Sequence, residues 1–234
     1  MINKEQLREY AQQFSVELDD MALDRFDYLE QRLLRWNEKV NLTAITDSEE
    51  IMIKHFIDSL TVLYAENMTE NAKVVDVGCG AGFPGLPILI ARPDLQFTFV
   101  DSVGKKLAFI REIVKDNGLF GEGIHERAEE LARTKEYRER YDYAVSRAVA
   151  PLNILAEYCI PLVKPGGMFI ALKGAEDEVQ LGENAVKETG GKIEKVVSLK
   201  LPNGDSRNII LIRKISQTPA KYPRKTKKIT AKPL

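Results

Sequence analysis

The chain has few cysteines, no long hydrophobic run and almost no net charge. Its two cysteines, Cys79 and Cys159, give neither a disulfide framework nor the spacing of metal ligands, so we expect a cytoplasmic protein without a bound metal. No apolar run approaches the roughly 20 residues that cross a bilayer, so we expect no membrane partner. The formal net charge of -1 excludes no class of partner by itself.

Acidic residues are absent from the C-terminal part of the chain. Between Ser206 and Leu234 there are nine lysines or arginines and no acid. This asymmetry favours a polyanion near the C-terminus, although a solvated charge run is the more common meaning of such a segment. After Lys214 the chain is rich in proline and lysine and has little to bury, so residues 217–234 are predicted to form a basic tail. The candidates for RNA contact are Arg207, Arg224, Lys225, Lys227 and Lys228.

A glycine-rich stretch follows the first strongly β-branched run. Val74–Val77 is typical of a buried strand, and glycines follow at Gly78, Gly80, Gly82 and Gly85. Glycine has no Cβ, so such a turn can adopt positive φ and let a ligand lie against the backbone. A strand, a glycine turn and a helix start together predict a nucleotide site at the carboxyl end of a sheet.

The glycine spacing fits two ligands. Gly80-x-Gly82-x-x-Gly85 matches the dinucleotide pattern, which is weak evidence alone. Asp76-x-Gly78-x-Gly80-x-Gly82 resembles the turn of S-adenosylmethionine-dependent methyltransferases. We favour the second interpretation, because Asp76 can face the cationic methionine end of that cofactor and would repel a pyrophosphate. A tight turn without a ligand is the alternative, but so many glycines cost stability.

Helical patterns fill the N-terminal third, over residues 4–14, 20–40 and from 47 onward, with a possible interruption near residues 58–59. We expect residues 1–66 to form a helical cap over the cofactor edge, or a packing extension without ligand contact. His55 and Asp58 share one helical face there, and we rate them as structural more often than catalytic.

From residue 74 onward, strand-like and helical runs alternate, which predicts an α/β fold with a doubly wound, mostly parallel sheet over residues 67–216. The last two strands have no helix between them and should form an antiparallel hairpin. Seven strands ending in a hairpin resemble a class I methyltransferase sheet more than a six-stranded dehydrogenase sheet. The predicted strands are 74–77, 97–101, 123–127, 141–146, 168–173, 193–199 and 208–213, and the helices between them are 87–91, 105–116, 128–133, 151–163 and 175–189.

Polar residues follow several of these strands. Asp101 can accept both ribose hydroxyl protons, or it can cap the next helix, a role that Ser102 could also fill. Ala128 and Glu129 follow the third strand beside the expected adenine position, so the Glu129 carboxylate or the local backbone could meet the adenine edge. A solvated helix start is an equally good interpretation of Glu129.

The fourth strand ends at Ser146-Arg147 without the Asn/Asp-Pro-Pro-aromatic tetrad that grips an exocyclic amine, and without a Pro-Cys pair. Arg147 is therefore the distinctive group. It could hold a carboxylate, a phosphate or a base edge, or it could pair with Asp142 or Glu129. Lys173 ends the fifth strand on the same side, and we treat Arg147 and Lys173 as positioning candidates while the catalytic residue is unknown.

Several linked motifs resemble one family, the bacterial 16S rRNA guanine-N7 methyltransferases, also called glucose-inhibited division protein B. The resemblance covers nearly the whole chain, and Cys79 is one departure from it, because a small residue, often serine, is expected there. The motifs are residues 41–46, 54–60, 76–87, 100–102 with 105–106, 127–129, 146–152, and the ending 222–225 with 232–234.

The resemblance implies methyl transfer from S-adenosyl-L-methionine to N7 of one guanine in 16S rRNA, either free or in the small ribosomal subunit. N7 carries a lone pair and no proton at neutral pH, so no general base is needed. We expect a monomer, since nothing indicates an obligate dimer. The cofactor contacts that the resemblance implies fall on Gly78, Phe83, Ala128, Glu129 and Arg147, with Asp101 at the ribose.

Three alternatives stay open at this point. One is a nucleotide-dependent oxidoreductase, because both cofactor classes use an acid such as Asp101. Another is a methyltransferase that acts on a different RNA or on a small molecule. The third is a non-catalytic RNA-binding module with a vestigial pocket.

Overall fold

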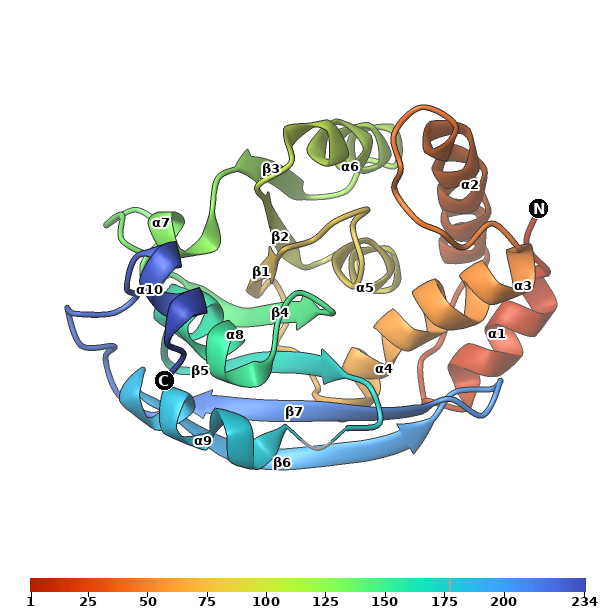
Figure 1. Ribbon diagram of the computed structural model, residues 1–234. Coiled ribbons are helices and arrows are strands. Elements are labelled where there is room, and N and C mark those ends of the chain that lie inside the picture. Colours follow the sequence, from red (N-terminus) through yellow and green to blue (C-terminus); the bar gives the residue numbers. More distant parts are fainter. Residues whose placement is uncertain (177) are drawn as a thin grey trace.

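Seven strands form one sheet in the order β3-β2-β1-β4-β5-β7-β6 (Figure 1). This computed structural model describes residues 1–176 and 178–234. Strands β1 to β5 run parallel to one another, so the predicted mostly parallel sheet is confirmed. The strands are β1 Lys73–Val77, β2 Gln96–Asp101, β3 Gly121–His125, β4 Tyr141–Arg147, β5 Val163–Lys173, β6 Gly191–Lys200 and β7 Ser206–Lys214.

The last two strands form the predicted antiparallel hairpin. Strand β7 lies between β5 and β6 and is antiparallel to both, with Ile170 of β5 opposite Leu211. This insertion places the start of β7, including Arg207, beside the carboxyl end of β5, which is Lys173. The antiparallel strand therefore places the cationic Arg207 at the edge where the parallel strands end.

Helices connect the strands close to the predicted bounds. The predicted helix over residues 175–189 begins only at Val179, and residue 177 lies outside the described residues. None of the described helices is both long enough and apolar enough to cross a membrane. The helices are α1 Lys4–Gln12, α2 Asp20–Asn37, α3 Ser48–Ile51, the π-helix η1 Met52–Ile57, α4 Asp58–Ala65, α5 Gly85–Ala91, α6 Gly104–Asp116, α7 Ala128–Leu131, α8 Leu152–Cys159, the 3₁₀ helix η2 Ile160–Leu162, α9 Val179–Glu188 and α10 Thr226–Ala231.

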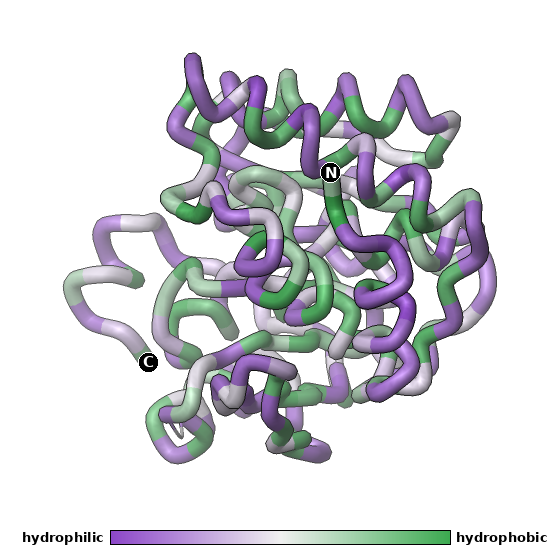
Figure 2. The backbone as a smooth tube through the Cα atoms, turned by 90° about the vertical axis from the view of Figure 1, so that its right-hand side faces the viewer, coloured by the Kyte–Doolittle hydropathy of each residue, from purple (hydrophilic) through white to green (hydrophobic). Residues whose placement is uncertain are grey.

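Two hydrophobic clusters cover the two faces of the sheet. Because side chains alternate along a strand, Val74 joins the cluster with α1, α2, α4, α5 and α6, whereas Val75 joins the one with α7, α8 and α9. Figure 1 shows these helix groups on opposite sides of the strands. In Figure 2 the outer helical turns alternate between hydrophilic and hydrophobic residues, as expected of helices with one face toward solvent.

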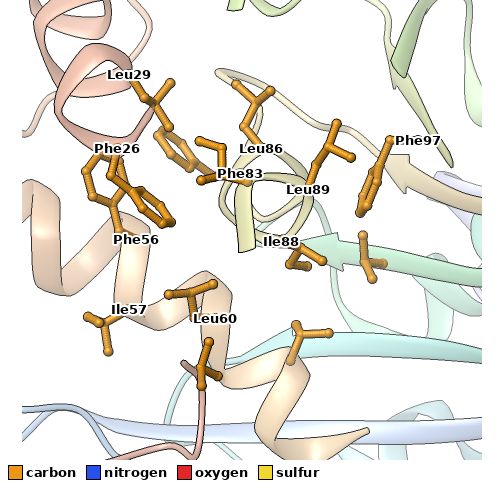
Figure 3. Close-up of a cluster of buried hydrophobic side chains, with 14 of the residues drawn as sticks. Phe26, Leu29, Phe56, Ile57, Leu60, Phe83, Leu86, Ile88, Leu89 and Phe97 are labelled. Atoms are coloured by element: carbon orange, nitrogen blue, oxygen red, sulfur yellow. The ribbon is translucent and has the colours of Figure 1, made fainter. Parts of the chain in front are cut away.

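The N-terminal cap is fastened to the glycine turn by aromatic packing. Phe56 of η1 packs between Phe26 of α2, at a ring distance of 5.0 Å, and Phe83 of the turn, at 6.2 Å. Figure 3 shows this cluster continuing into Leu86 and Leu89 of α5. The helical irregularity lies at η1, which ends at Ile57, just before the predicted break at 58–59. The buried contacts hold η1 against the carboxyl edge of the sheet.

The C-terminal segment folds onto the domain, and the expectation that it has little to bury is wrong. Tyr222 and Ile229 are buried, and helix α10 packs against α8. Arg224 donates to Glu157 of α8 through Nε, at 3.0 and 3.1 Å, and through Nη2, at 2.8 Å. Residues 217–234, which are mostly polar, thus form a structured segment along α7 and α8, here called the strap.

Candidate functional site

The glycine turn is built from left-handed backbone at the end of β1. Gly78, Gly80 and Gly82 have φ values of 68°, 56° and 88°, which L side chains rarely adopt. The Gly78 N–H donates to the carbonyl of Val100 at 2.8 Å, and the Gly80 N–H donates to Asp101 Oδ2 at 2.9 Å. The turn is therefore tied to the carboxyl end of β2.

Asp101 organises this edge from β2. Its Oδ1 accepts from the Val103 N–H at 2.7 Å while Oδ2 holds Gly80. Helix α6 begins at Gly104 with Val103 at its N-cap position, so neither Asp101 nor Ser102 is the cap residue. Asp101 is 8% exposed and lines the first cavity described below. Its predicted contact with the ribose stays a prediction.

Asp76 lies beneath the turn and lines neither of the cavities described below. It is fully buried, its Oδ2 accepts from the Gly85 N–H at 2.9 Å, and its Oδ1 has no hydrogen-bond partner among the described residues. Burial raises the pKa of Asp76 to about 7. A Cβ at Gly85 would lie 2.7 Å from Oδ2, so this glycine permits the contact.

The first cavity, of about 150 Å³, opens at the carboxyl ends of β1, β2 and β3. Its walls combine bare backbone at Gly78, the Asp101 carboxylate, the start of α7 and the Tyr158 ring of α8. The structure therefore brings together four predicted cofactor residues, Gly78, Asp101, Ala128 and Glu129. Glu129 is 3% exposed, and its Oε1 accepts from the Thr226 hydroxyl, so it is not the solvated helix start considered above.

The second cavity, of about 680 Å³, lies between η1, the end of β4, the end of β5 and the start of β7. It contains the two positioning candidates, Arg147 and Lys173, together with Arg207. Val149 lines both cavities and contacts the turn, because a Cβ added to Gly78 would lie 2.5 Å from Val149 Cγ2. The two cavities thus share Val149, which packs against Gly78 of the glycine turn.

Arg147 pairs with Asp58, so the alternative partners considered above, Asp142 and Glu129, are wrong. Its Nη1 donates to Asp58 Oδ2 at 3.1 Å and to the Lys54 carbonyl at 2.9 Å. Burial lowers the pKa of Arg147, while Asp58 acts in the opposite direction.

Phe83 lies under this guanidinium, with the Arg147 carbon 5.4 Å from its ring centroid. The cap thereby fixes a cation of β4 over the glycine turn.

His55 completes this stack from η1. Its ring lies 4.5 Å from the Phe83 ring at 12°, and its Nε2 lies 2.8 Å from Thr43 Oγ1. Burial, together with the Arg147 charge, lowers the pKa of His55 to about 4. The imidazole is therefore neutral at neutral pH, and its Nδ1 accepts from Arg147 Nη2 at 3.3 Å.

Asp58 joins the cap to the last strand as well. Arg207 Nε donates to Asp58 Oδ1 at 3.0 Å, so one carboxylate bridges two arginines. His55 and Asp58 both line the second cavity, although their sequence pattern favoured a structural role. Two signals in the sequence pointed to them, the shared helical face and the family motif over residues 54–60.

Lys173 approaches the second cavity from β5. Its Nζ donates to the Ala150 carbonyl at 2.6 Å and lies 2.8 Å from Glu178 Oε2. The same Glu178 oxygen accepts from the Leu152 N–H at 2.6 Å, which fixes the loop that follows β4.

The basic residues of the C-terminal segment line neither cavity. Arg224 holds the fully buried Glu157 with its guanidinium, and the RNA contact predicted for Arg224 stays a prediction. Lys225, Lys227 and Lys228 are exposed, and their RNA contact stays a prediction.

Residues 23–210 match the family model described as rRNA small subunit methyltransferase G. The chain belongs to that family. Curated family members are similar over nearly their full length. One from Alkaliphilus oremlandii, named ribosomal RNA small subunit methyltransferase G, is 44% identical and covers 99% of this chain and 98% of its own. Another of the same name, from Acetivibrio thermocellus, is 46% identical, with 97% and 95% covered.

Solved structures of other proteins have a fold similar to that of this chain. TrmN from Thermus thermophilus aligns with a TM-score of 0.54 at 17% identity, over 68% of this chain and 48% of that chain. TYW2 of M. jannaschii, solved in complex with AdoMet, aligns with a TM-score of 0.51 at 16% identity, over 63% and 71%. At such identities the likeness concerns the class I methyltransferase fold alone.

Proposed function

We propose that this methyltransferase transfers the methyl group of S-adenosylmethionine to N7 of a guanine in 16S ribosomal RNA. The supporting observation is a pair of cavities that share Val149 beside the glycine turn. The first cavity is lined by Gly78 and the acids Asp101 and Glu129, and the second by Arg147, Lys173 and Arg207. Family membership and the names of the relatives support the same reaction.

The first cavity fits the nucleoside half of that cofactor. A Cβ placed on Gly80 would meet nothing nearer than 4.0 Å, so this face of the turn is open to a ligand. Asp101 can accept from ribose hydroxyls, and Glu129 can accept from the adenine amino group. Asp76 is fully buried beneath the same turn and lines neither cavity, so its predicted contact with the cationic methionine end stays a prediction.

The second cavity fits a nucleotide whose N7 faces the turn. S-adenosylmethionine supplies an electrophilic methyl group, and N7 of guanine is a nucleophile that needs no deprotonation. His55 matches that requirement, because its two ring nitrogens are engaged by Thr43 and Arg147 and it is not free to act as a base.

The protein's task in this reaction is to hold the two reacting atoms close and in line. Arg147, Lys173 and Arg207 can bind guanine O6 or the neighbouring phosphates. The base has to leave its stack to enter the cavity, so an unpaired guanine in a loop is the expected target. We further propose that the protein acts as a monomer in the cytoplasm, on free rRNA or on the small subunit.

We propose the same three-part division for the chain. Residues 1–66 are the cap that contributes His55 and Asp58, residues 67–216 are the methyltransferase domain, and residues 217–234 are the C-terminal segment.

Mapping of N7-methylguanosine in 16S rRNA tests the proposal. We expect one site to be lost on deletion of the gene, to return with the wild-type chain, and to stay absent with Gly78→Val. The matched control is Gly118→Ala, which also places a side chain at positive φ (61°) but has no neighbour within 4 Å. An unchanged methylation map after deletion contradicts the proposal.

A thermal-shift panel distinguishes the proposed methyltransferase from the oxidoreductase alternative. S-adenosylhomocysteine should raise the melting temperature, and NADH should not. The opposite result would reject the methyltransferase assignment of the first cavity.

A further inference from the structure

The C-terminal segment reaches the back of the first cavity at two points. Thr226, the first residue of α10, donates its hydroxyl hydrogen to Glu129 Oε1 across 97 positions of sequence. Two residues earlier, Arg224 pairs with Glu157, which directly precedes the cavity residue Tyr158. Figure 1 shows α10 lying beside α7 and α8. The segment therefore braces both helices that line the adenine end of the cavity.

These anchors fix the position of Thr226. Glu157 is fully buried and accepts from the Arg224 backbone N–H at 2.5 Å as well as from its guanidinium. Arg133 Nη2 donates to the Pro223 carbonyl at 3.0 Å, and Ile229 is fully buried on the far side. Thr226 thus lies between two anchored positions, Arg224 and Ile229, which hold its hydroxyl beside Glu129.

A glutamate side chain has three rotatable bonds, and only one of its two oxygens is held here. No described protein group donates to Glu129 Oε2, although the residue is only 3% exposed and lines the cavity. We propose that Thr226 is a positioning residue that fixes Glu129 so that its second oxygen accepts a hydrogen from the 6-amino group of the adenine. This inference rests on the proposed function of the first cavity.

The chemistry of the base makes the proposal specific. Adenine presents an N–H donor at position 6, which a carboxylate accepts. Hypoxanthine presents a carbonyl oxygen there, which a fixed carboxylate repels. A correctly oriented Glu129 should therefore discriminate between the two bases, whereas a freely rotating one should discriminate less.

Calorimetric titration with S-adenosylhomocysteine and S-inosylhomocysteine tests this. The wild-type protein should prefer the adenine compound, and Thr226→Val should lower the ratio of the two affinities about tenfold, in line with the loss of a hydrogen bond to a charged group. Thr226→Ser keeps the hydroxyl and should restore the wild-type ratio. The control is Thr230→Val on the same helix, whose exposed hydroxyl donates only to the Thr226 carbonyl.

A double-mutant cycle supplies the decisive comparison. If Thr226 acts through Glu129, Thr226→Val should change the ratio very little in a Glu129→Gln background. An unchanged ratio in Thr226→Val, or a full further loss in the double variant, overturns the inference.

Two other results of these titrations also have a defined meaning. If Thr226→Val does not fold, Thr226→Ala replaces it with the same expectations, because alanine leaves no bulk against the carboxylate. If the wild-type protein binds neither compound, the proposed function fails, and the inference fails with it.

Discussion

Gly78 shows at a single residue how the turn joins conformation to binding. Its φ of 68° costs an L residue about 1–2 kcal/mol, and a Cβ there would also collide with Val149. We expect Gly78→Val to abolish calorimetric binding of S-adenosylhomocysteine, because a branched side chain blocks the backbone that a ligand would approach. Gly118→Ala carries the φ strain without a collision, because nothing lies within 4 Å, so it should lose less stability and keep the affinity. Unchanged affinity in Gly78→Val contradicts a ligand at this turn.

His55 gives a prediction about protonation. The buried ring beside the Arg147 charge should titrate with a pKa of about 4, well below its usual value of 6.5. Imidazole NMR spectra recorded against pH measure this directly, and His125→Gln assigns the signals, because the chain has only two histidines. A pKa above 6 would show that the stack on Phe83 is open in solution.

The same shift predicts the sign of a stability change. Because the folded state disfavours protonated His55, its contribution to stability is present above pH 6.5 and is lost as the pH falls toward 4. Denaturant unfolding of His55→Asn should show a shallower loss of stability over this interval than the wild type does. An identical slope would contradict a buried neutral ring.

At the scale of elements, the C-terminal segment packs against α7 and α8, although its sequence predicts a charged tail. Arg224→Ala leaves Glu157 fully buried without its cation, so we expect a loss of roughly 3 kcal/mol or more in unfolding free energy, measured with denaturant. Lys227→Ala, an exposed change on the same segment, should leave the stability unchanged. Equal effects of the two substitutions would mean that the segment is detached in solution.

The π-helix η1 has a comparable role at the opposite end of the chain. It places Lys54 and His55 beside β4, and Asp58, the first residue of α4, joins Arg147 to Arg207. Irregular helical turns are frequent at functional sites, and here the irregularity adjoins the second cavity. The cap therefore contributes to the site instead of only packing on the domain.

For the whole molecule, the charge distribution predicts how RNA binding depends on salt. Neutralising Lys225, Lys227 and Lys228 to glutamine should weaken binding of 16S rRNA and lower the slope of log affinity against log salt by about 2, as expected for lost phosphate contacts. Filter binding over a salt series measures both quantities.

The control for that series is a variant with three exposed lysines neutralised elsewhere, at Lys115, Lys192 and Lys195. If the C-terminal variant keeps the wild-type slope, the RNA contacts the second cavity without crossing α10. If both variants lose the same slope, the attraction is a general charge effect.

The sequence by itself determined the strands, the helices before residue 217 and the glycine turn, because those follow from local rules. It missed α10 in the predicted tail. Alternating and helical periodicities placed all seven strands, and the missing helix after residue 199 predicted the hairpin. Positive φ is open to Gly78 because glycine has no Cβ, and the turn adopts it.

Only the tertiary structure decided which charged groups meet. Arg147 paired with Asp58, 89 positions away, and not with the predicted partners, because the cap packs at the carboxyl edge of the sheet. Arg224 and Thr226 found Glu157 and Glu129 on helices far back in the chain. Such pairings depend on how elements pack across the whole fold, and no periodicity or spacing along the chain encodes that geometry.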